Sequence, residues 1–207
     1  MKSRIALIDY KAGNLTSVKK AFAALGADLA VPERPEELRQ FAAVVVPGVG
    51  HFAATQALAG DWIDAIREGL AGGKPLLGIC LGMQWLFEGS AEAPDCPGLG
   101  VLEGRCYKLA GGANGAAIKI PHVGWNALEF RRSDSIANGI APESQVYYTH
   151  SFVAPITGDT VAVTEHGHPF AAIVQRGRVA GVQFHPEKSA DVGLNVLRNF
   201  LGWLRER

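Results

Sequence analysis

The chain has 207 residues, of which 48% are hydrophobic, and its 20 basic and 20 acidic side chains give a formal net charge of +0 at pH 7. This composition predicts a globular protein with a sizeable core, and the balanced charge argues against nucleic acid or an anionic membrane as partner. Three cysteines without metal-ligand spacing argue against a disulfide framework; with no signal peptide or membrane-length apolar run, they predict a cytoplasmic protein.

The first half of the chain alternates short apolar runs with segments of helical spacing. Strands are predicted at residues 5–9, 28–31, 42–46 and 75–79, and helical segments at residues 15–25, 35–38, 52–58 and 62–70. This alternation predicts a parallel sheet covered by helices on both faces. Ligands of such sheets bind at the carboxyl ends of the strands, so we expect the functional site there.

The second half consists mainly of short strands and loops. Strands are predicted at residues 101–109, 118–120, 124–130, 145–148, 161–165, 170–175 and 179–184, a hairpin tip at 111–115, and a closing helix at 190–204. Several of these strands are expected to be antiparallel. The predicted fold is therefore α/β, with a mostly parallel central sheet flanked by helices and additional antiparallel strands in the C-terminal half. No repeat or linker is visible, so residues 1–207 are expected to form a single domain.

A candidate nucleophile lies where the apolar run 75–79 ends. The pattern Gly78-Ile79-Cys80-Leu81-Gly82 has the strand, sharp turn and helix of a nucleophile elbow, with cysteine in place of serine. The turn would place the Cys80 sulfur near a helix N-terminus, which stabilises a thiolate. A lone cysteine after an apolar run is more often part of the core, so the elbow alone leaves both interpretations open.

The best candidate for the base is His185, at the end of the apolar strand 179–184. Pro186 favours an extended conformation at His185, and residues two apart in extended chain point to the same side, so Glu187 can reach the ring. A carboxylate on one ring nitrogen leaves the other free to take a thiol proton. The alternative is a strand exit with two solvated polar residues. A metal site is a weaker interpretation, because no helix-spaced histidine pair is present.

Attack on a carboxamide also requires donors for the oxyanion, each contributing roughly 3 to 4 kcal/mol. The N–H of Leu81 is the first candidate, and the N–H of Val49 or Gly50, in a glycine-rich loop, is the second. The alternative for this loop is an ordinary turn after a strand. A dinucleotide site is excluded because the third glycine of that motif is replaced by Ala53.

Three segments together resemble the class I glutamine amidotransferases. They are Pro47-Gly48-Val49-Gly50, residues 78–84 around Cys80, and residues 183–189 around His185. The resemblance covers almost the whole chain. Residues 9–14, 121–126 and 147–152 are similar to the branch of this family that serves histidine biosynthesis. The family resemblance implies a Cys80, His185 and Glu187 triad that hydrolyses glutamine through a thioester, without a cofactor or metal.

The resemblance also implies a glutamine pocket and a partner. Glutamine would be bound by Gly50, Gln84, Glu92, His150 and Ser151. Ammonia would pass to a (βα)8-barrel cyclase, which forms imidazole glycerol phosphate and an aminoimidazole carboxamide ribotide. The surface of this chain that contacts the cyclase in the heterodimer would include Asn14, Trp125, Tyr147 and Lys188.

The sequence departs from the family pattern in one place and leaves other functions open. Lys11 stands where the family more often has glycine, which puts the shape of the first loop in question. The alternatives are the glutaminase of another synthase, such as those making pyridoxal phosphate or anthranilate, a cysteine hydrolase acting on peptides, and a non-catalytic binding module on the same fold.

Overall fold

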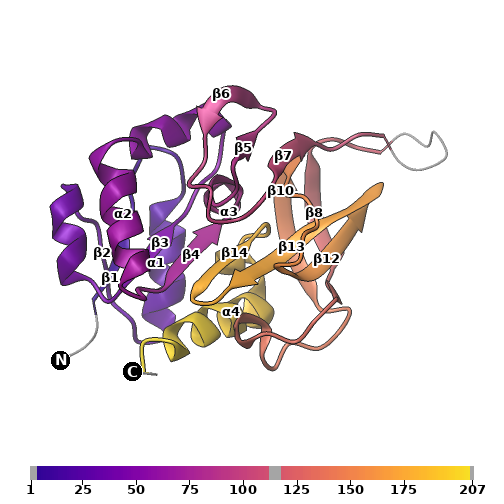
Figure 1. The fold of residues 1–207 in the computed structure, drawn as a ribbon. Coiled ribbons are helices and arrows are strands. Elements are labelled where there is room, and N and C mark those ends of the chain that lie inside the picture. The colour runs from indigo at the N-terminus through magenta and orange to yellow at the C-terminus, as the bar shows by residue number, and fades with distance from the viewer. Residues whose placement is uncertain (1–3, 112–117, 206–207) are drawn as a thin grey trace.

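The computed structural model describes residues 4–111 and 118–205. Its central element is an eight-stranded mixed sheet (Figure 1). The strand order is β2-β1-β3-β4-β14-β13-β12-β9. Pairing is parallel from β2 to β14 and antiparallel from β14 to β9. The predicted fold class is therefore confirmed. The strands are β1 (Ile5–Leu7), β2 (Leu29–Ala30), β3 (Ala43–Val46), β4 (Leu76–Ile79), β9 (Glu129–Phe130), β12 (Thr160–His166), β13 (His168–Arg176) and β14 (Val179–Val182).

One face of the sheet is covered by α1 (Leu15–Ala24) and α4 (Ala190–Gly202). Alternate residues of a strand point to opposite faces, and Ile5 of β1 and Val45 of β3 point to this one. They share a core with Phe22 of α1 and Phe200 of α4, whose rings meet edge to face at 6.4 Å. The closing helix predicted from residue 190 is thus one wall of the core.

The opposite face is covered by α2 (Asp61–Ala71), α3 (Leu81–Trp85) and two 3-10 helices, η1 (Pro35–Gln40) and η2 (Phe52–Leu58). Val44 and Val46 of β3 point to this second core, which also contains Ile66 of α2 and Met83 of α3. Because both faces of the parallel strands are buried, these strands are apolar throughout, as their sequences predict.

Two smaller sheets accompany the large one (Figure 1). One has the order β11-β7-β5-β6 and the other pairs β10 with β8. Their strands are β5 (Gly89–Ser90), β6 (Ala93–Pro97), β7 (Arg105–Lys108), β8 (His122–Ala127), β10 (Gln145–His150) and β11 (Phe152–Val153). Short 3-10 helices η4 (Ser135–Ala137) and η5 (Pro186–Lys188) complete the elements. Among the described residues, no helix has the length and apolar character needed to span a bilayer.

The prediction of a strand at residues 118–120 is wrong, because the structure has no strand there. The carbonyl of Lys119 accepts a hydrogen bond from the His166 side chain at 2.9 Å, so this backbone pairs with a side chain instead of a neighbouring strand. The predicted hairpin tip at 111–115 lies outside the described residues except for Gly111. The helical segments predicted at 35–38 and 52–58 are 3-10 helices, while 62–70 is the α-helix α2.

Candidate active site

Cys80 occupies a sharp turn between β4 and α3. Its backbone has φ 53° and ψ −106°, a region that non-glycine residues rarely adopt. The Cys80 N–H donates to the carbonyl of Val182 at 2.8 Å, which ties the turn to β14. Strain of this kind persists where surrounding structure enforces it and is common at functional sites.

The glycines on either side of Cys80 are required by close backbone contacts. A Cβ atom on Gly82 would lie 1.8 Å from the carbonyl oxygen of Val46, and one on Gly78 would lie 2.6 Å from the carbonyl oxygen of Gly82. Both distances are far below van der Waals contact. Glycine at position 82 therefore lets the turn pack against β3, and glycine at position 78 lets β4 pass the first turn of α3.

Pairing of β4 with β14 brings the cysteine and histidine segments to the same edge of the sheet. Ile79 and Val182 are directly opposite each other in this parallel pair, so the chain leaves both strands at the same level. Beyond Val182, Gln183 donates its side-chain N–H to the Cys80 sulfur at 3.6 Å. His185 follows, held by a hydrogen bond from its N–H to the carbonyl of Tyr147 at 2.9 Å.

His185 and Glu187 form a buried pair. Nδ1 of His185 lies 2.8 Å from Oε1 of Glu187, and both side chains are only 3% exposed. Burial lowers the pKa of His185, but the Cys80 sulfur and the Glu187 carboxylate together raise it more, to about 10. The ring is thus protonated at neutral pH. Its Nε2 has no hydrogen-bond partner among the described residues, so this nitrogen is left for the sulfur and the substrate.

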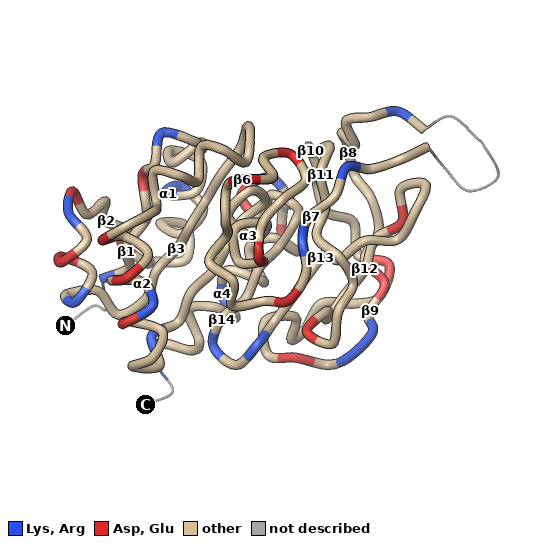
Figure 2. The backbone as a smooth tube through the Cα atoms, turned by 45° about the horizontal axis from the view of Figure 1, so that its top comes forward, with Lys and Arg blue, Asp and Glu red and all other residues tan. Residues whose placement is uncertain are grey.

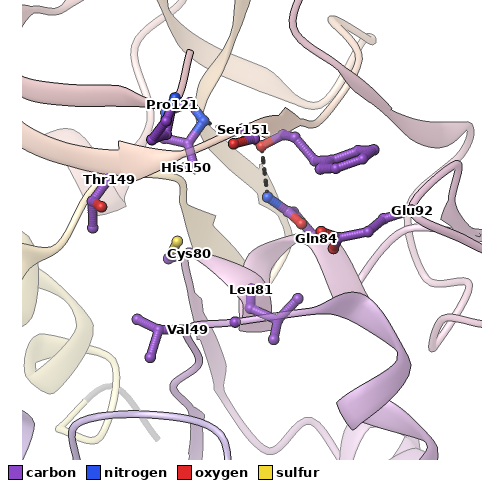
Figure 3. Close-up of a pocket in the computed structure, with 11 residues that line it drawn as sticks. Val49, Cys80, Leu81, Gln84, Glu92, Pro121, Thr149, His150 and Ser151 are labelled. Carbon is purple, nitrogen blue, oxygen red and sulfur yellow. Dashed lines mark hydrogen bonds between the residues drawn. The ribbon is translucent and has the colours of Figure 1, made fainter.

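A cavity of about 220 Å³ opens beside Cys80 (Figure 3). This volume is below the roughly 300 to 1,000 Å³ of pockets for drug-sized ligands, so it suits a small metabolite. Val49 and Leu81 lie on one side of the sulfur and His150 and Ser151 on the other (Figure 3). The structure brings together every residue expected to bind glutamine: Gly50, Gln84, Glu92, His150 and Ser151 all line the cavity.

Gln84 and Glu92 are held in place by hydrogen bonds to backbone groups and to the side chain of Gln183. The Gln84 amide nitrogen donates to the carbonyl of Phe152 at 2.8 Å and to the side-chain oxygen of Gln183 at 3.3 Å. Glu92 lies between β5 and β6, and its carboxylate accepts a hydrogen bond from the N–H of Phe52 at 2.8 Å. Hydrogen bonds to β11 and to the start of η2 thus fix these two polar side chains at the wall of the cavity.

A buried pair of neutral histidines supports the opposite wall. His150 donates from Nδ1 to the carbonyl of Phe152 at 3.2 Å, so its Nε2 accepts from Nδ1 of His122, also at 3.2 Å. Burial and the neighbouring histidines lower the pKa of His150 to about 3, and burial and His166 lower that of His122 to about 4. Sequence reasoning missed His122 because nothing in a lone histidine indicates its partner.

The candidate oxyanion donors are not all free in this structure. The N–H of Leu81 donates to the carbonyl of Gly48 at 3.3 Å. Because a trans peptide points its C=O and N–H in opposite directions, the Val49 N–H of the same peptide unit is directed away from Leu81. Rotation of the Gly48–Val49 peptide would free the first donor and turn the second toward the cavity. Gly50, with φ 107°, leaves the loop adaptable at that point.

The residues expected at the partner interface form a cluster near the triad. The Trp125 and Tyr147 rings meet edge to face at 6.1 Å, and the Lys188 ammonium lies 5.7 Å from the centre of the Tyr147 ring. Asn14 and Lys188 line a small crevice that His185 also borders. Trp125 is 54% exposed.

Lys11, the departure from the family pattern, adopts the left-handed conformation, with φ 63°. Glycine favours that region, so the glycine expected here from the family resemblance would fit this backbone. Lys11 compensates with hydrogen bonds to Asp9 from its backbone N–H at 2.9 Å and from its ammonium at 3.0 Å. The loop therefore accepts a side chain that points to solvent.

Sequence reasoning also missed Gln183. Gln183 stands two residues before His185 at the end of one strand, so alternation along the strand could have pointed to it. Among the described residues, no group of three or more His, Cys, Asp or Glu side chains is arranged to hold a metal ion.

Comparison with known proteins defines the class to which this fold and site belong. The family model for "Glutamine amidotransferase class-I" matches residues 6–202. The chain therefore belongs to the class I glutamine amidotransferases. Among solved structures, a chain in the structure of PurLQS from Thermotoga maritima has a TM-score of 0.75 with 19% identity, covering 99% of this chain and 100% of that one. At this identity the likeness is one of fold.

Within this class, the chain is similar to the HisH subunits of imidazole glycerol phosphate synthases. The chain is 42% identical over 201 residues to the imidazole glycerol phosphate synthase subunit HisH of Bacillus cereus, covering 96% of this chain and 94% of the relative. It is 43% identical over 200 residues to subunit HisH 1 of Campylobacter jejuni, covering 95% and 98%. Both relatives match along nearly their full length.

Proposed function

We propose that this chain is the glutaminase subunit of an imidazole glycerol phosphate synthase in histidine biosynthesis. Its reaction is hydrolysis of glutamine to glutamate and ammonia. The observation that carries the proposal is the position of Cys80 beside the His185–Glu187 pair, at the edge of a cavity lined by all five expected glutamine-binding residues. Identities of 42% and 43% to two HisH subunits support the particular pathway.

The first half of the reaction forms a thioester. The Cys80 thiolate attacks the side-chain carboxamide carbon of glutamine, and the carbonyl oxygen becomes an oxyanion. His185 donates the proton from Nε2 to the departing nitrogen as the carbon–nitrogen bond breaks, which releases ammonia. Glu187 holds the ring through Nδ1 and stabilises its charged form.

The second half returns the enzyme to its starting state. A water molecule gives a proton to the now neutral His185 and attacks the thioester carbon. The carbon–sulfur bond breaks, glutamate leaves and the Cys80 thiolate is regenerated beside the imidazolium. Each turnover thus consumes one glutamine and one water and yields one glutamate and one ammonia.

Oxyanion stabilisation is the step that the resting structure leaves incomplete. The proposed donors are the N–H groups of Leu81 and of Val49 or Gly50. The hydrogen bond from Leu81 to Gly48 withholds the first of them. Because each such donor contributes roughly 3 to 4 kcal/mol, the isolated chain is expected to turn over slowly, and a partner can activate it by favouring the rotated Gly48–Val49 peptide.

The proposed partner is a (βα)8-barrel cyclase, bound as a heterodimer in the cytoplasm through a surface that includes Asn14, Trp125, Tyr147 and Lys188. Ammonia would pass to it without release to solvent, and the cyclase would form imidazole glycerol phosphate and an aminoimidazole carboxamide ribotide. The cluster of these side chains next to the triad supports the assignment. We further propose that the chain forms a single domain.

Replacement of the nucleophile tests this function. Cys80→Ala in complex with the cyclase should release no glutamate above the solution background, because no other described group can form the thioester. Cys96→Ala is the matched control: Cys96 is buried but contacts Thr55, so this variant should keep wild-type turnover. Glutamate release by Cys80→Ala would refute the nucleophile, and failure of the wild-type chain to complement a histidine-requiring strain would refute the pathway.

A further inference from the structure

Tyr10 carries a buried hydroxyl that the resting structure leaves unused. The residue is 5% exposed, and its oxygen has no hydrogen-bond partner among the described residues. Most buried polar groups in proteins are paired, so an unpaired one calls for an explanation. Burial and the nearby Cys80 raise the pKa of Tyr10 above its ordinary value, and the hydroxyl is therefore a proton donor at neutral pH.

The Tyr10 hydroxyl lies directly against the loop that carries the candidate oxyanion donor. A Cβ atom on Gly48 would lie only 2.0 Å from this oxygen, so the phenol occupies the space beside the Gly48 Cα. Gly13, from the same loop as Tyr10, also packs on Gly48: a Cβ there would lie 3.5 Å from the Gly48 Cα. The first loop is thus the support on which the Gly48–Val49 peptide rests.

We propose that Tyr10 is a positioning residue that stabilises the rotated, active form of the Gly48–Val49 peptide. In the resting form the Gly48 carbonyl accepts from Leu81. Rotation breaks that bond and would leave the carbonyl buried without a donor. The unpaired Tyr10 hydroxyl, already in contact with Gly48, supplies one, and the N–H groups of Leu81 and Val49 are both released for the oxyanion. The inference rests on the proposed glutaminase function.

A direct role of the hydroxyl at the cysteine is less consistent with the contacts. The donor to the Cys80 sulfur is Gln183, at 3.6 Å, and Tyr10 makes no hydrogen bond to the sulfur in the described residues. The position of the hydroxyl therefore favours the carbonyl of Gly48 over the sulfur as its partner in the active form.

The test is Tyr10→Phe, which keeps the ring and removes only the hydroxyl. In complex with the cyclase and its substrate, the ratio of stimulated to basal kcat should fall by about two- to tenfold, the range of one net hydrogen bond. The KM for glutamine should stay at the wild-type value, since the hydroxyl does not face the substrate. Glutamate γ-semialdehyde, whose adduct with Cys80 carries the oxyanion, should bind the activated variant more weakly by the same factor.

A stability measurement separates this role from a merely structural one. Tyr10→Phe should raise the unfolding midpoint of the isolated chain, because it removes an unpaired buried hydroxyl. Tyr148→Phe is the matched control and should lower it, since that hydroxyl is bonded to Thr164 at 2.6 Å. Unchanged stimulation and semialdehyde affinity in Tyr10→Phe would overturn the proposal. An inactive wild-type complex would instead overturn the glutaminase function, so the two failures are distinguishable.

Discussion

At the scale of single residues, the site contains histidines in two opposite protonation states. His122, His150 and His185 are all buried. A carboxylate and a sulfur interact with His185 and favour its charged form, whereas His122 and His150 pair with each other and with backbone oxygen and stay neutral. The neutral pair can shape the cavity wall without adding charge, while in the proposed reaction His185 carries the proton that the leaving ammonia needs.

The neutral pair predicts acid sensitivity of the fold. In the unfolded chain both histidines take up a proton near the ordinary pKa of 6.5, but in the folded protein they resist protonation until about pH 4 for His122 and 3 for His150. Between these values the unfolded state binds more protons, so the free energy of unfolding should fall with falling pH. Each histidine contributes up to about 1.4 kcal/mol per pH unit in that window.

Denaturant unfolding of the wild type and His122→Asn between about pH 7 and 4.5 checks this, since it spans the acid side of the ordinary histidine pKa. The variant is expected to start less stable, because it loses the bond to His150, but to lose less stability per pH unit. Equal slopes for the two proteins would mean that His122 does not stay neutral in the fold.

At the scale of elements, the sequence predicted the parts of the site that follow from strand ends. The apolar runs before Cys80 and before Gln183 marked β4 and β14, and the glycines around Cys80 marked the turn. The joint register of the two strands was not predictable. It arises from the pairing of Ile79 with Val182, which depends on contacts between residues about a hundred positions apart.

Other elements gave no usable signal. β5 and β11 have two residues each, too short for alternation to be recognised. Residues 118–120 are apolar enough to resemble a strand, yet the carbonyl of Lys119 accepts a hydrogen bond from the side chain of His166. The orientation of the Gly48–Val49 peptide also lies beyond sequence patterns, because glycine permits both arrangements.

Helix α4 offers an element-scale prediction through two of its glycines. A Cβ on Gly193 would lie 2.0 Å from the carbonyl oxygen of Pro186, between His185 and Glu187, whereas one on Gly202 would meet nothing within 4 Å. Gly193→Ala should therefore push η5 away from α4. We expect glutaminase activity to fall by about tenfold or more, because small misplacements of reacting groups are costly, with a loss of about 1 to 3 kcal/mol in stability.

Gly202→Ala in the same helix is the control, with unchanged activity and a gain of up to about 1 kcal/mol from helix propensity. Steady-state kinetics and urea unfolding of both variants provide the comparison. Wild-type activity in Gly193→Ala would contradict the view that packing of η5 on α4 sets the position of His185.

At the scale of the whole molecule, charge is balanced and dispersed. The 20 basic and 20 acidic side chains cancel, and Figure 2 shows both signs distributed over the two halves of the molecule. Long-range attraction therefore contributes little to association, and recognition of a partner must rest on short-range contacts. The large hydrophobic side chains left exposed include Trp125 at 54% and Val123 at 53%, both on β8.

The last prediction concerns this exposed surface of β8. Tryptophan is enriched among the residues that dominate binding energy, and Trp125 is already ordered by its contact with Tyr147, so little side-chain entropy is lost when a partner covers it. Trp125→Ala should weaken the complex with the cyclase by at least about 2 kcal/mol, or roughly thirtyfold in Kd. Tyr107→Ala, which removes an aromatic ring 36% exposed on β7, should leave Kd unchanged. Calorimetric titration of each variant measures both values, and the balanced charge predicts that the wild-type Kd changes little with salt. Equal affinity of Trp125→Ala and wild type would place the cyclase on another face of the molecule.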